Sequence, residues 1–328
     1  MYVPTGETNN VVIIDLQRDT IIGRIAELEN AHGLAASPNS DFLVAGSMLQ
    51  QESGEARRAA KPANVGEAEH QAHHPADDSA QTPTTSPSYV SIIHPEHGRV
   101  LRRIAVRALT HHMAVSPDGK IAVAVHSGAG GISVIDLDKM NVVTAVQTGA
   151  GPNYAVFSRD GKRLYISNAR PGTVSEIDTR AWSVKREFAV GKEPEHIVLN
   201  ADGTRLFSTN VAEGTVAEVE LKSGTVVKRY AVGAQPHGID VSADGRWLFV
   251  SSKGDNKLVR IDLSNDEQRV LDLQPAPYHL DYVDSVGKLY VSSRMAPRIW
   301  VVGAQAMTIR GEIDLGQGVA HQMVILDK

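Results

Sequence analysis

The 328-residue chain contains no cysteine. Without a thiol the protein cannot form disulfides, use a cysteine nucleophile, hold an iron–sulfur cluster or a cysteine-ligated zinc ion, or attach haem through Cys-x-x-Cys-His. Any metal site in this chain must therefore be built from nitrogen and oxygen ligands.

A strong charge of one sign and long apolar runs are also missing. The net charge is −5, from 33 basic and 38 acidic residues, and basic residues cluster only in short pairs such as Arg102-Arg103. We therefore expect no nucleic-acid partner. No apolar run approaches the length of a membrane helix, and the N-terminus lacks the charged and apolar regions of a signal peptide. We expect neither a membrane span nor a signal peptide in this chain. Its hydrophobic content of 42% is ordinary for a globular protein.

A short phrase ending in Asp-Gly returns at intervals of 42 residues. Its four clear copies are Ser116–Gly119, Ser158–Gly161, Asn200–Gly203 and Ser242–Gly245. Degenerate copies occur at Ser37–Ser40 and Val283–Ser285. A repeat of this length that contains only short strands is typical of the blades of a β-propeller.

Each repeat has the pattern of four strands. In the clearest unit, apolar segments at 238–241, 247–250, 258–263 and 269–271 are separated by turn residues, including Asp244-Gly245. Asp-Gly suits a tight hairpin because glycine adopts positive φ without a Cβ clash. No long segment has helical periodicity, so we expect almost no helix.

The two ends of the chain complete each other under this interpretation. The N-terminus supplies a second, third and fourth strand, and residues 321–326 supply a first strand with no successors. Pairing them would close the ring and cover its open sheet edges. The sequence thus predicts an all-β protein, one seven-bladed β-propeller domain over residues 1–328, with four antiparallel strands per blade and first strands near residues 32, 111, 153, 196, 237, 279 and 321.

An insertion at about 50–87 interrupts one blade between its second and third strands. It is rich in Ala, Glu, Gln, Pro, Ser and Thr, so it cannot bury a core of its own, and it contains His70, His73 and His74. We consider two alternatives for this insertion: a surface segment without a role, and an arm whose histidines deliver a metal ion to the channel mouth or that covers the mouth.

The repeated phrases resemble the YVTN-type, YncE-like β-propeller repeat proteins, which are related to cytochrome d1-type propellers. The resemblance lies in Tyr2–Thr5 with Val11–Asp15, in Leu164–Asn168 with Val174–Asp178, and in Pro236–Gly245. Thr5 departs from the asparagine of the family pattern. The resemblance implies a propeller fold and an exported, periplasmic or secreted protein, and leaves the function open. Lactonases and streptogramin lyases occur in neighbouring propeller families, but their fuller signatures are missing here.

Histidine recurs where the first strand of each blade begins, in six of the seven blades. First strands line the channel of a propeller, so these side chains converge on one axis, at the end from which the insertion also emerges. They fall into two adjacent alignment columns, and neighbouring strand positions point to opposite sides, so three or four of them could meet one ion. The candidate metal ligands are His32, His111, His112, His196, His237, His279 and His321.

Two interpretations of this ring stay open: a metal site and a ring of ordinary hydrogen-bonded histidines. Imidazoles with a possible Glu195 carboxylate favour copper, with zinc next. The predicted function is metal binding at the channel mouth by a monomeric exported protein. The alternatives are an enzyme at the same mouth, either a lactonase-like hydrolase or a handler of a haem-d1-type tetrapyrrole, and a scaffold for a protein partner. No nucleotide cofactor is indicated, because the glycine-rich stretch 127–131 lacks a strand–glycine–helix setting.

Overall fold

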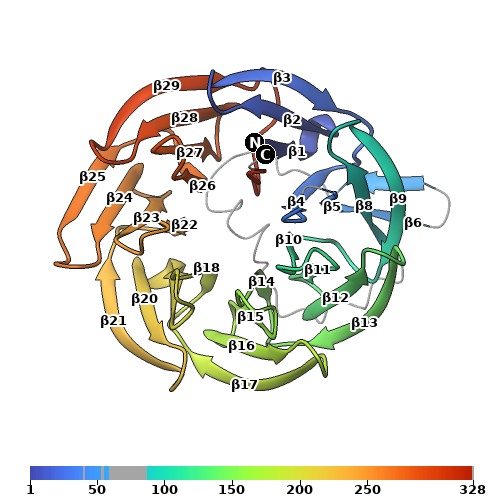
Figure 1. Cartoon of the computed structure of the whole chain (residues 1–328), viewed down its shortest axis with the longest axis horizontal. Helices are drawn as coiled ribbons and strands as arrows, with labels where there is room; N and C mark the ends of the chain where they lie inside the picture. Colours follow the sequence, from blue (N-terminus) through green and yellow to red (C-terminus); the bar gives the residue numbers. More distant parts are fainter. Residues whose placement is uncertain (40, 53–54, 59–86, 327–328) are drawn as a thin grey trace.

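The structure is a computed structural model that describes residues 1–39, 41–52, 55–58 and 87–326. Seven antiparallel sheets follow one another around a central axis (Figure 1). Six have four strands and the N-terminal sheet has three, and within each sheet the strands are paired in chain order from the axis outward. This confirms the predicted seven-bladed propeller. Two 3₁₀ turns, Gly6–Thr8 and Val211–Glu213, are the helical segments of the described residues, and none of these residues forms a helix able to cross a membrane.

The blades have the following strands, each read from the axis outward. They are β1 (Tyr2–Thr5), β2 (Asn10–Asp15) and β3 (Thr20–Ile25); β4 (Ala31–Ala36), β5 (Leu43–Ser47), β8 (Ser88–His94) and β9 (Arg99–Val106); β10 (His112–Val115), β11 (Ile121–His126), β12 (Gly131–Asp136) and β13 (Asn141–Gln147); β14 (Pro152–Phe157), β15 (Arg163–Asn168), β16 (Thr173–Asp178) and β17 (Ser183–Ala189); β18 (Pro194–Leu199), β19 (Arg205–Asn210), β20 (Thr215–Glu220) and β21 (Thr225–Ala231); β22 (Pro236–Val241), β23 (Trp247–Ser252), β24 (Lys257–Asp262) and β25 (Gln268–Asp272); β26 (Pro277–Val283), β27 (Lys288–Ser293), β28 (Arg298–Gly303) and β29 (Thr308–Asp314).

The core lies between neighbouring blades. The middle strands are apolar on both faces because each is covered by a blade on either side, whereas the outermost strands alternate exposed and half-buried residues, as in β17. One cluster, for example, packs Val123 and Ile132 of one blade against Leu164 and Ile166 of the next. The rigid blades leave a central channel lined by the first strands.

The repeated Asp-Gly phrase forms the turn between first and second strands, as predicted. Asp118 Oδ1 accepts hydrogen bonds from Ser116 Oγ at 2.6 Å and from the Lys120 amide at 3.1 Å. The glycine at the end of the phrase has φ between 69° and 72° in all four clear copies. That conformation costs a residue with a Cβ free energy, so glycine is needed there.

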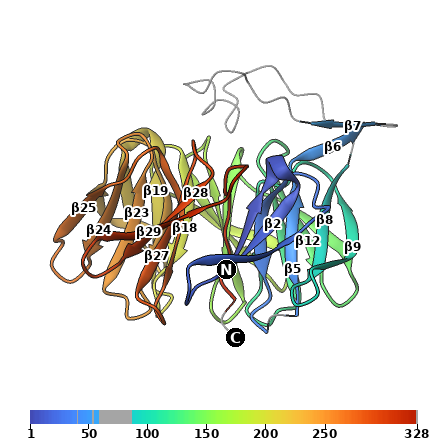
Figure 2. The same ribbon diagram turned by 90° about the horizontal axis from the view of Figure 1, so that it is seen from above.

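The predicted insertion falls between β5 and β8, which are neighbours in their sheet. Its first part forms a hairpin of β6 (Leu49–Glu52) and β7 (Glu55–Arg58) that stands out from one face of the ring (Figure 2). His70, His73 and His74 lie outside the described residues. Because Ser47 pairs with Ala31, β5 ends beside the beginning of β4, and the insertion leaves the ring at the end where the first strands begin.

The C-terminal segment closes the ring, but it forms a single β-bridge rather than a full first strand. Tyr2 and Val324 exchange backbone hydrogen bonds of 2.8 and 3.0 Å, and the two chain ends lie together beside the channel (Figure 1). Gln322 then ties this segment to two other blades. Its Oε1 accepts from the amides of Leu34 and Met113, and its Nε2 donates to the Met113 carbonyl at 2.9 Å.

Replacing Gln322 by methionine should destabilise the closed ring. Two buried amides and one carbonyl lose their partner, so we expect the free energy of unfolding to fall by about 2–4 kcal/mol in urea denaturation. Gln305→Met, at an exposed turn, is the matched control and should change it by less than about 0.5 kcal/mol. Equal effects of the two substitutions would contradict this role of Gln322.

Candidate metal centre

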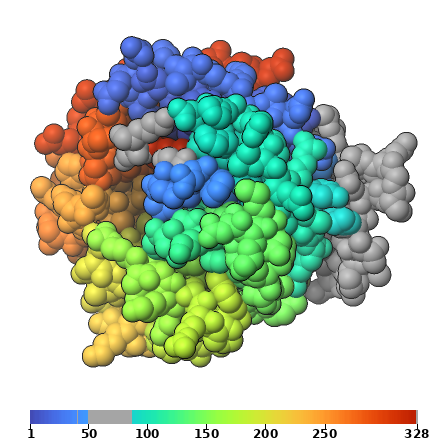
Figure 3. Space-filling view, turned by 45° about the vertical axis from the view of Figure 1, so that its right-hand side comes forward, coloured from blue at the N-terminus to red at the C-terminus, as the bar shows by residue number. Residues whose placement is uncertain are grey.

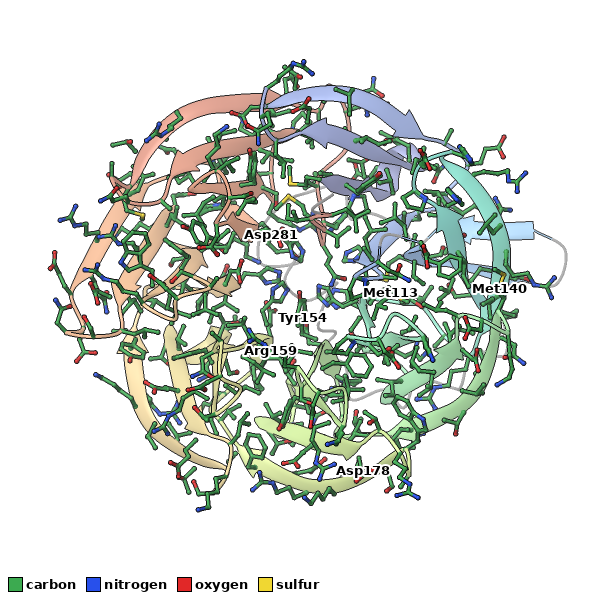
Figure 4. All side chains as sticks on the ribbon, viewed as in Figure 1. Met113, Met140, Tyr154, Arg159, Asp178 and Asp281 are labelled. Carbon is green, nitrogen blue, oxygen red and sulfur yellow. The ribbon has the colours of Figure 1, made fainter. Side chains whose placement is uncertain are left out.

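The predicted histidines lie inside the central channel, at the beginning of its inner strands. All seven are buried, with between 1% and 6% of each residue exposed. They therefore line the interior of the channel rather than an open mouth. Figure 4 shows residues of three different blades, Met113, Tyr154 and Asp281, gathered in this central region.

In four of the blades a β-bulge sets the direction of the side chains at the beginning of the inner strand. In β14, β18, β22 and β26 the pairing with the second strand shifts just after the initial proline, so that two inner-strand residues share one position, for example between Pro194 and Ile197. A bulge re-aims side chains, which is why bulges occur beside functional sites. In these blades the bulged pairs are Asn153-Tyr154, Glu195-His196, His237-Gly238 and Tyr278-His279.

A hydroxyl from the second strand holds each bulge. Thr209 Oγ1 accepts from the His196 amide at 3.0 Å and lies 3.2 Å from the His237 carbonyl of the next blade. Ser167, Ser251 and Ser292 accept from the equivalent amides of Tyr154, Gly238 and His279. These hydroxyls were missed in the sequence, although their spacing of 41 or 42 residues follows the repeat.

His112, His196 and His279 come together as one group. Their nearest potential ligand atoms all lie within 4.8 Å of one another, and their ring centroids are 4.8–5.6 Å apart. They belong to β10, β18 and β26, which are alternate blades of the ring. The group is the second of the two alignment columns in the sequence, so this column points toward the axis in three blades.

The other four candidates surround this group without joining it. His32 stacks on His321 at 3.8 Å between ring centroids and on His111 at 4.9 Å, and its Nδ1 donates to the His111 carbonyl at 2.9 Å. His237 stacks on Tyr278 at 3.9 Å. His126 hydrogen-bonds the Leu109 carbonyl and the Ser133 hydroxyl, so both of its ring nitrogens are used in the fold.

Two glycines in the second column let the neighbouring histidine backbones approach. A Cβ on Gly33 would lie 2.8 Å from His112 Cα, and one on Gly238 would lie 2.4 Å from the Tyr278 carbonyl oxygen. Such contacts are closer than real Cβ atoms make, so any larger residue would push the inner strands apart. Glycine in two blades thus permits the histidines of the next blades to reach the axis.

Each of the three central imidazoles has a buried nitrogen that the described residues leave without a hydrogen bond. His112 Nδ1 lies 2.8 Å from the Asn153 carbonyl oxygen, which can only accept, so this nitrogen carries the proton and Nε2 is the acceptor. Within the described part of the chain, Nε2 of His112, His196 and His279 is buried and has no hydrogen-bond partner. Burial holds the pKa of all three well below the ordinary value, with nearby imidazoles adding to the effect. The rings are therefore neutral near pH 7, which is the form that binds metal.

A buried carboxylate lies beside the group. Glu195 accepts a hydrogen bond from His237 Nδ1, and both residues are 4% exposed. The negative charge of Glu195 acts to raise the pKa of His112 and of His196, against the effect of burial. The same field favours a cation at the histidines.

A cavity of about 320 Å³ continues along the channel from the histidines. His196 and His279 line one part of it, and Pro117, in the turn between β10 and β11, lines another. It therefore extends toward the end of the first strands, away from the β5–β8 insertion. Figure 3 shows a hollow near the centre of the ring. Its polar lining also includes Tyr154, Asp240, Asp281 and Gln322, which sequence reasoning missed.

Comparisons with known proteins identify the architecture. A family model described as "Lactonase, 7-bladed beta-propeller" matches residues 92–282. Curated proteins give no match. The chain resembles hydrazine synthase from Kuenenia stuttgartiensis with 17% identity and a TM-score of 0.71, over 90% of this chain and 89% of that one. It resembles a functionally unknown protein from Desulfotomaculum acetoxidans with 15% identity and a TM-score of 0.73, over 98% of this chain and 99% of that one. A putative 6-phosphogluconolactonase from Bacteroides uniformis is similar with 14% identity and a TM-score of 0.72, over 99% of this chain and 96% of that one. At this identity the likeness shows the fold alone.

The buried histidines should make the metal-free protein sensitive to mild acid. Burial lowers the pKa of His32 to about 3 and of His126 to about 4, and lowers those of the three central histidines. Between pH 6.5 and these values the unfolded chain binds protons that the native protein does not, so stability falls as the pH falls. At pH 5 each histidine should cost about 2 kcal/mol relative to pH 7.5.

Urea unfolding of chelator-treated protein at pH 7.5 and pH 5 measures this loss. Burial raises the pKa of Asp240 to about 6 and that of Asp281 well above its usual value, which offsets part of the loss, because the native protein gains protons at these two groups. His126→Asn should reduce the pH dependence by about 2 kcal/mol, and exposed His97→Asn should not change it. A stability that stays constant or rises at pH 5 would contradict the neutral, buried state of the histidines.

Proposed function

The chain belongs to the lactonase family of seven-bladed β-propellers, and we propose that within this fold it is a metal-binding protein. The ion is held inside the channel by Nε2 of His112, His196 and His279. His32, His111, His237 and His321, which the sequence also suggested as ligands, surround the ion and orient its ligands.

The observation that carries the proposal is the set of three buried imidazole nitrogens that have no hydrogen-bond partner among the described residues. A buried polar atom without a hydrogen bond costs about 1–3 kcal/mol, so native proteins rarely contain one, and here each of three neighbouring histidines has one. A metal ion would satisfy all three at once. A purely structural ring would instead give each nitrogen a hydrogen-bond partner, as in His126, whose two ring nitrogens meet the Leu109 carbonyl and the Ser133 hydroxyl.

The geometry needs little adjustment to hold an ion. Bonds of about 2.0–2.1 Å at tetrahedral angles place ligand nitrogens about 3.3 Å apart. The group has its atoms within 4.8 Å, so small rotations of the rings close it around an ion. Three neutral imidazoles without a thiolate favour copper(II), which binds nitrogen ligands most tightly among the common divalent ions, with zinc next.

Three protein ligands leave a further coordination position for another molecule. Metal sites that act on substrates have this arrangement, whereas structural zinc sites have four protein ligands. Because His196 and His279 also line the cavity, a molecule there would be next to the ion. This supports a small exogenous ligand, and hydrolysis by a metal-activated water is the second candidate function. A cavity of about 320 Å³ is at the small end of ligand pockets, which disfavours a tetrapyrrole.

Removing one ligand should abolish tight metal binding. We expect near-stoichiometric copper or zinc in protein purified without a histidine tag, measured by plasma mass spectrometry, and saturable binding in calorimetric titration of the chelator-treated protein. His196→Ala or His279→Ala should weaken this binding by at least about 100-fold, more than the 10- to 100-fold typical of a residue behind a ligand.

The control must exclude the histidines of the insertion. All titrations therefore use a background in which His70, His73 and His74 are replaced by glutamine. His97→Ala, which removes an exposed histidine of the β8–β9 turn, should leave the affinity unchanged. Circular dichroism checks that each variant is folded. Absence of saturable binding in the background protein, or equal loss in His97→Ala and His196→Ala, would refute the metal site.

Glu195 should tune the affinity without binding the ion. Glu195→Gln keeps the size of the side chain but removes the buried negative charge and changes the partner of His237. We expect metal affinity to fall by about 10- to 100-fold while one ion per chain is still bound. Glu312→Gln, which removes an exposed carboxylate of β29, is the control. An unchanged affinity in Glu195→Gln would contradict the electrostatic role.

A further inference from the structure

We propose that the cavity beyond the histidines binds a small organic cation, with an ammonium group between Asp240 and Asp281 and an apolar body against the walls. This site lies beside the metal group, and two of the proposed metal ligands, His196 and His279, also line the cavity. It uses two carboxylates that the propeller fold does not require.

The repeat shows that the two acids are exceptional. Each follows the second column by two residues, so its side chain points to the same face as the histidines and Tyr154. In the other five blades this position is Ala35, Ala114, Val156, Val198 or Val324. A small apolar residue therefore satisfies the fold here, and only β22 and β26 carry a carboxylate.

The carboxylates lack a cationic partner in the cavity wall. Among the residues that the structure describes, those that line the cavity include Asp240 and Asp281 but no lysine or arginine. Backbone amides of Val241 and Tyr282 donate to Asp240 at 2.8 Å each, whereas Asp281 has no hydrogen bond within the described residues. The Met1 ammonium lies near enough to lower the pKa of Asp281, but it donates to the Ile14 carbonyl and does not line the cavity. Carboxylates inside a protein are normally paired, so the described lining of the cavity leaves this half-buried pair without a cation.

The remaining polar groups of the cavity favour a donor. Nε2 of His196 and of His279 has no hydrogen-bond partner among the described residues and accepts a donor in the neutral Nδ1-protonated form, and both residues are at most 4% exposed. Gln322 Nε2 is already used at the Met113 carbonyl. An ammonium group carries three donors and no acceptor, which complements this set.

The walls favour an organic cation over a bare metal ion. Val156, Phe157, Val198, Ile239 and Leu280 surround the acids, and a ligand with an apolar body buries this surface. Phe157 adds an aromatic ring that can interact with a cation. A phosphorylated or carboxylated ligand is disfavoured, because it would meet two carboxylates without a basic partner.

Three ligands of similar shape and different charge test this inference. Calorimetry on the chelator-treated full chain at pH 7.5 compares cyclohexylammonium, cyclohexanol and cyclohexanecarboxylate. We expect cyclohexylammonium to bind at least tenfold more tightly than cyclohexanol, and cyclohexanecarboxylate to show no saturation. Equal binding of all three, or tightest binding of the carboxylate, would overturn the proposal.

Asp281→Asn then assigns the effect to the cavity. The substitution removes charge at constant size, so we expect at least a tenfold loss for cyclohexylammonium and no change for cyclohexanol, which also reports that the cavity is intact. Exposed Asp138→Asn is the control and should not alter either affinity. Retention of cyclohexylammonium binding in Asp281→Asn would overturn the assignment, as would a Ca²⁺ site that depends on Asp281 and excludes cyclohexylammonium.

His112→Ala separates this proposal from the metal proposal. His112 is a proposed metal ligand but does not line the cavity. The variant should lose metal binding and keep its affinity for cyclohexylammonium within about twofold. Loss of both in a folded variant would show that the cation requires the metal, and would refute an independent cation site.

Discussion

The structure depends on the convergence of seven inner strands on one axis. Because each blade contributes the same repeat position to the channel, a single alignment column becomes a ring of facing side chains. That column reads Gly33, His112, Tyr154, His196, Gly238, His279 and Gln322. The glycines allow close approach, the histidines meet, and Gln322 ties the C-terminal segment to two other blades. The convergence of the inner strands thus both closes the ring and brings the site residues together.

β-Bulges and hydroxyls of the second strands hold these side chains in place with little disturbance of the sheets. The bulges occur at the beginning of the inner strands, where only one neighbouring strand must be accommodated, and the hydroxyls of Ser167, Thr209, Ser251 and Ser292 accept from the displaced amides. Since hydroxyls such as Thr209 Oγ1 also contact a carbonyl of the next blade, the direction of one imidazole is coupled to the position of its neighbour. Rigid positioning of this kind is what a preorganised site requires.

The sequence was sufficient for the fold, because a 42-residue period and Asp-Gly turns are local signals that do not depend on packing. It also placed the candidate ligands on one ring and separated them into two columns. It could not show which column faces the axis, because the bulges that decide this depend on pairing with the second strand. Asp240 and Asp281 were missed because an acid on a strand usually faces solvent, and only the closed ring shows that this position faces the channel.

The C-terminal segment was expected to form a full strand, yet only Val324 bridges to Tyr2 while the Gln322 side chain supplies further contacts. The YVTN-type resemblance stays a prediction beside the broader lactonase family that the comparisons show.

The polar groups of the channel favour a positively charged ligand. The Gln322 amide and Nδ1 of His112 donate within the fold, whereas three imidazole nitrogens and the carboxylate of Asp281 have no hydrogen-bond partner among the described residues. Glu195 adds a buried carboxylate next to the imidazoles. Valine or alanine at the positions of Asp240 and Asp281 would satisfy the fold, as they do at the equivalent positions of the other five blades. The acceptors instead make the channel a place where positive charge is stabilised, and this applies equally to a metal ion at the histidines and to an ammonium group at the two aspartates.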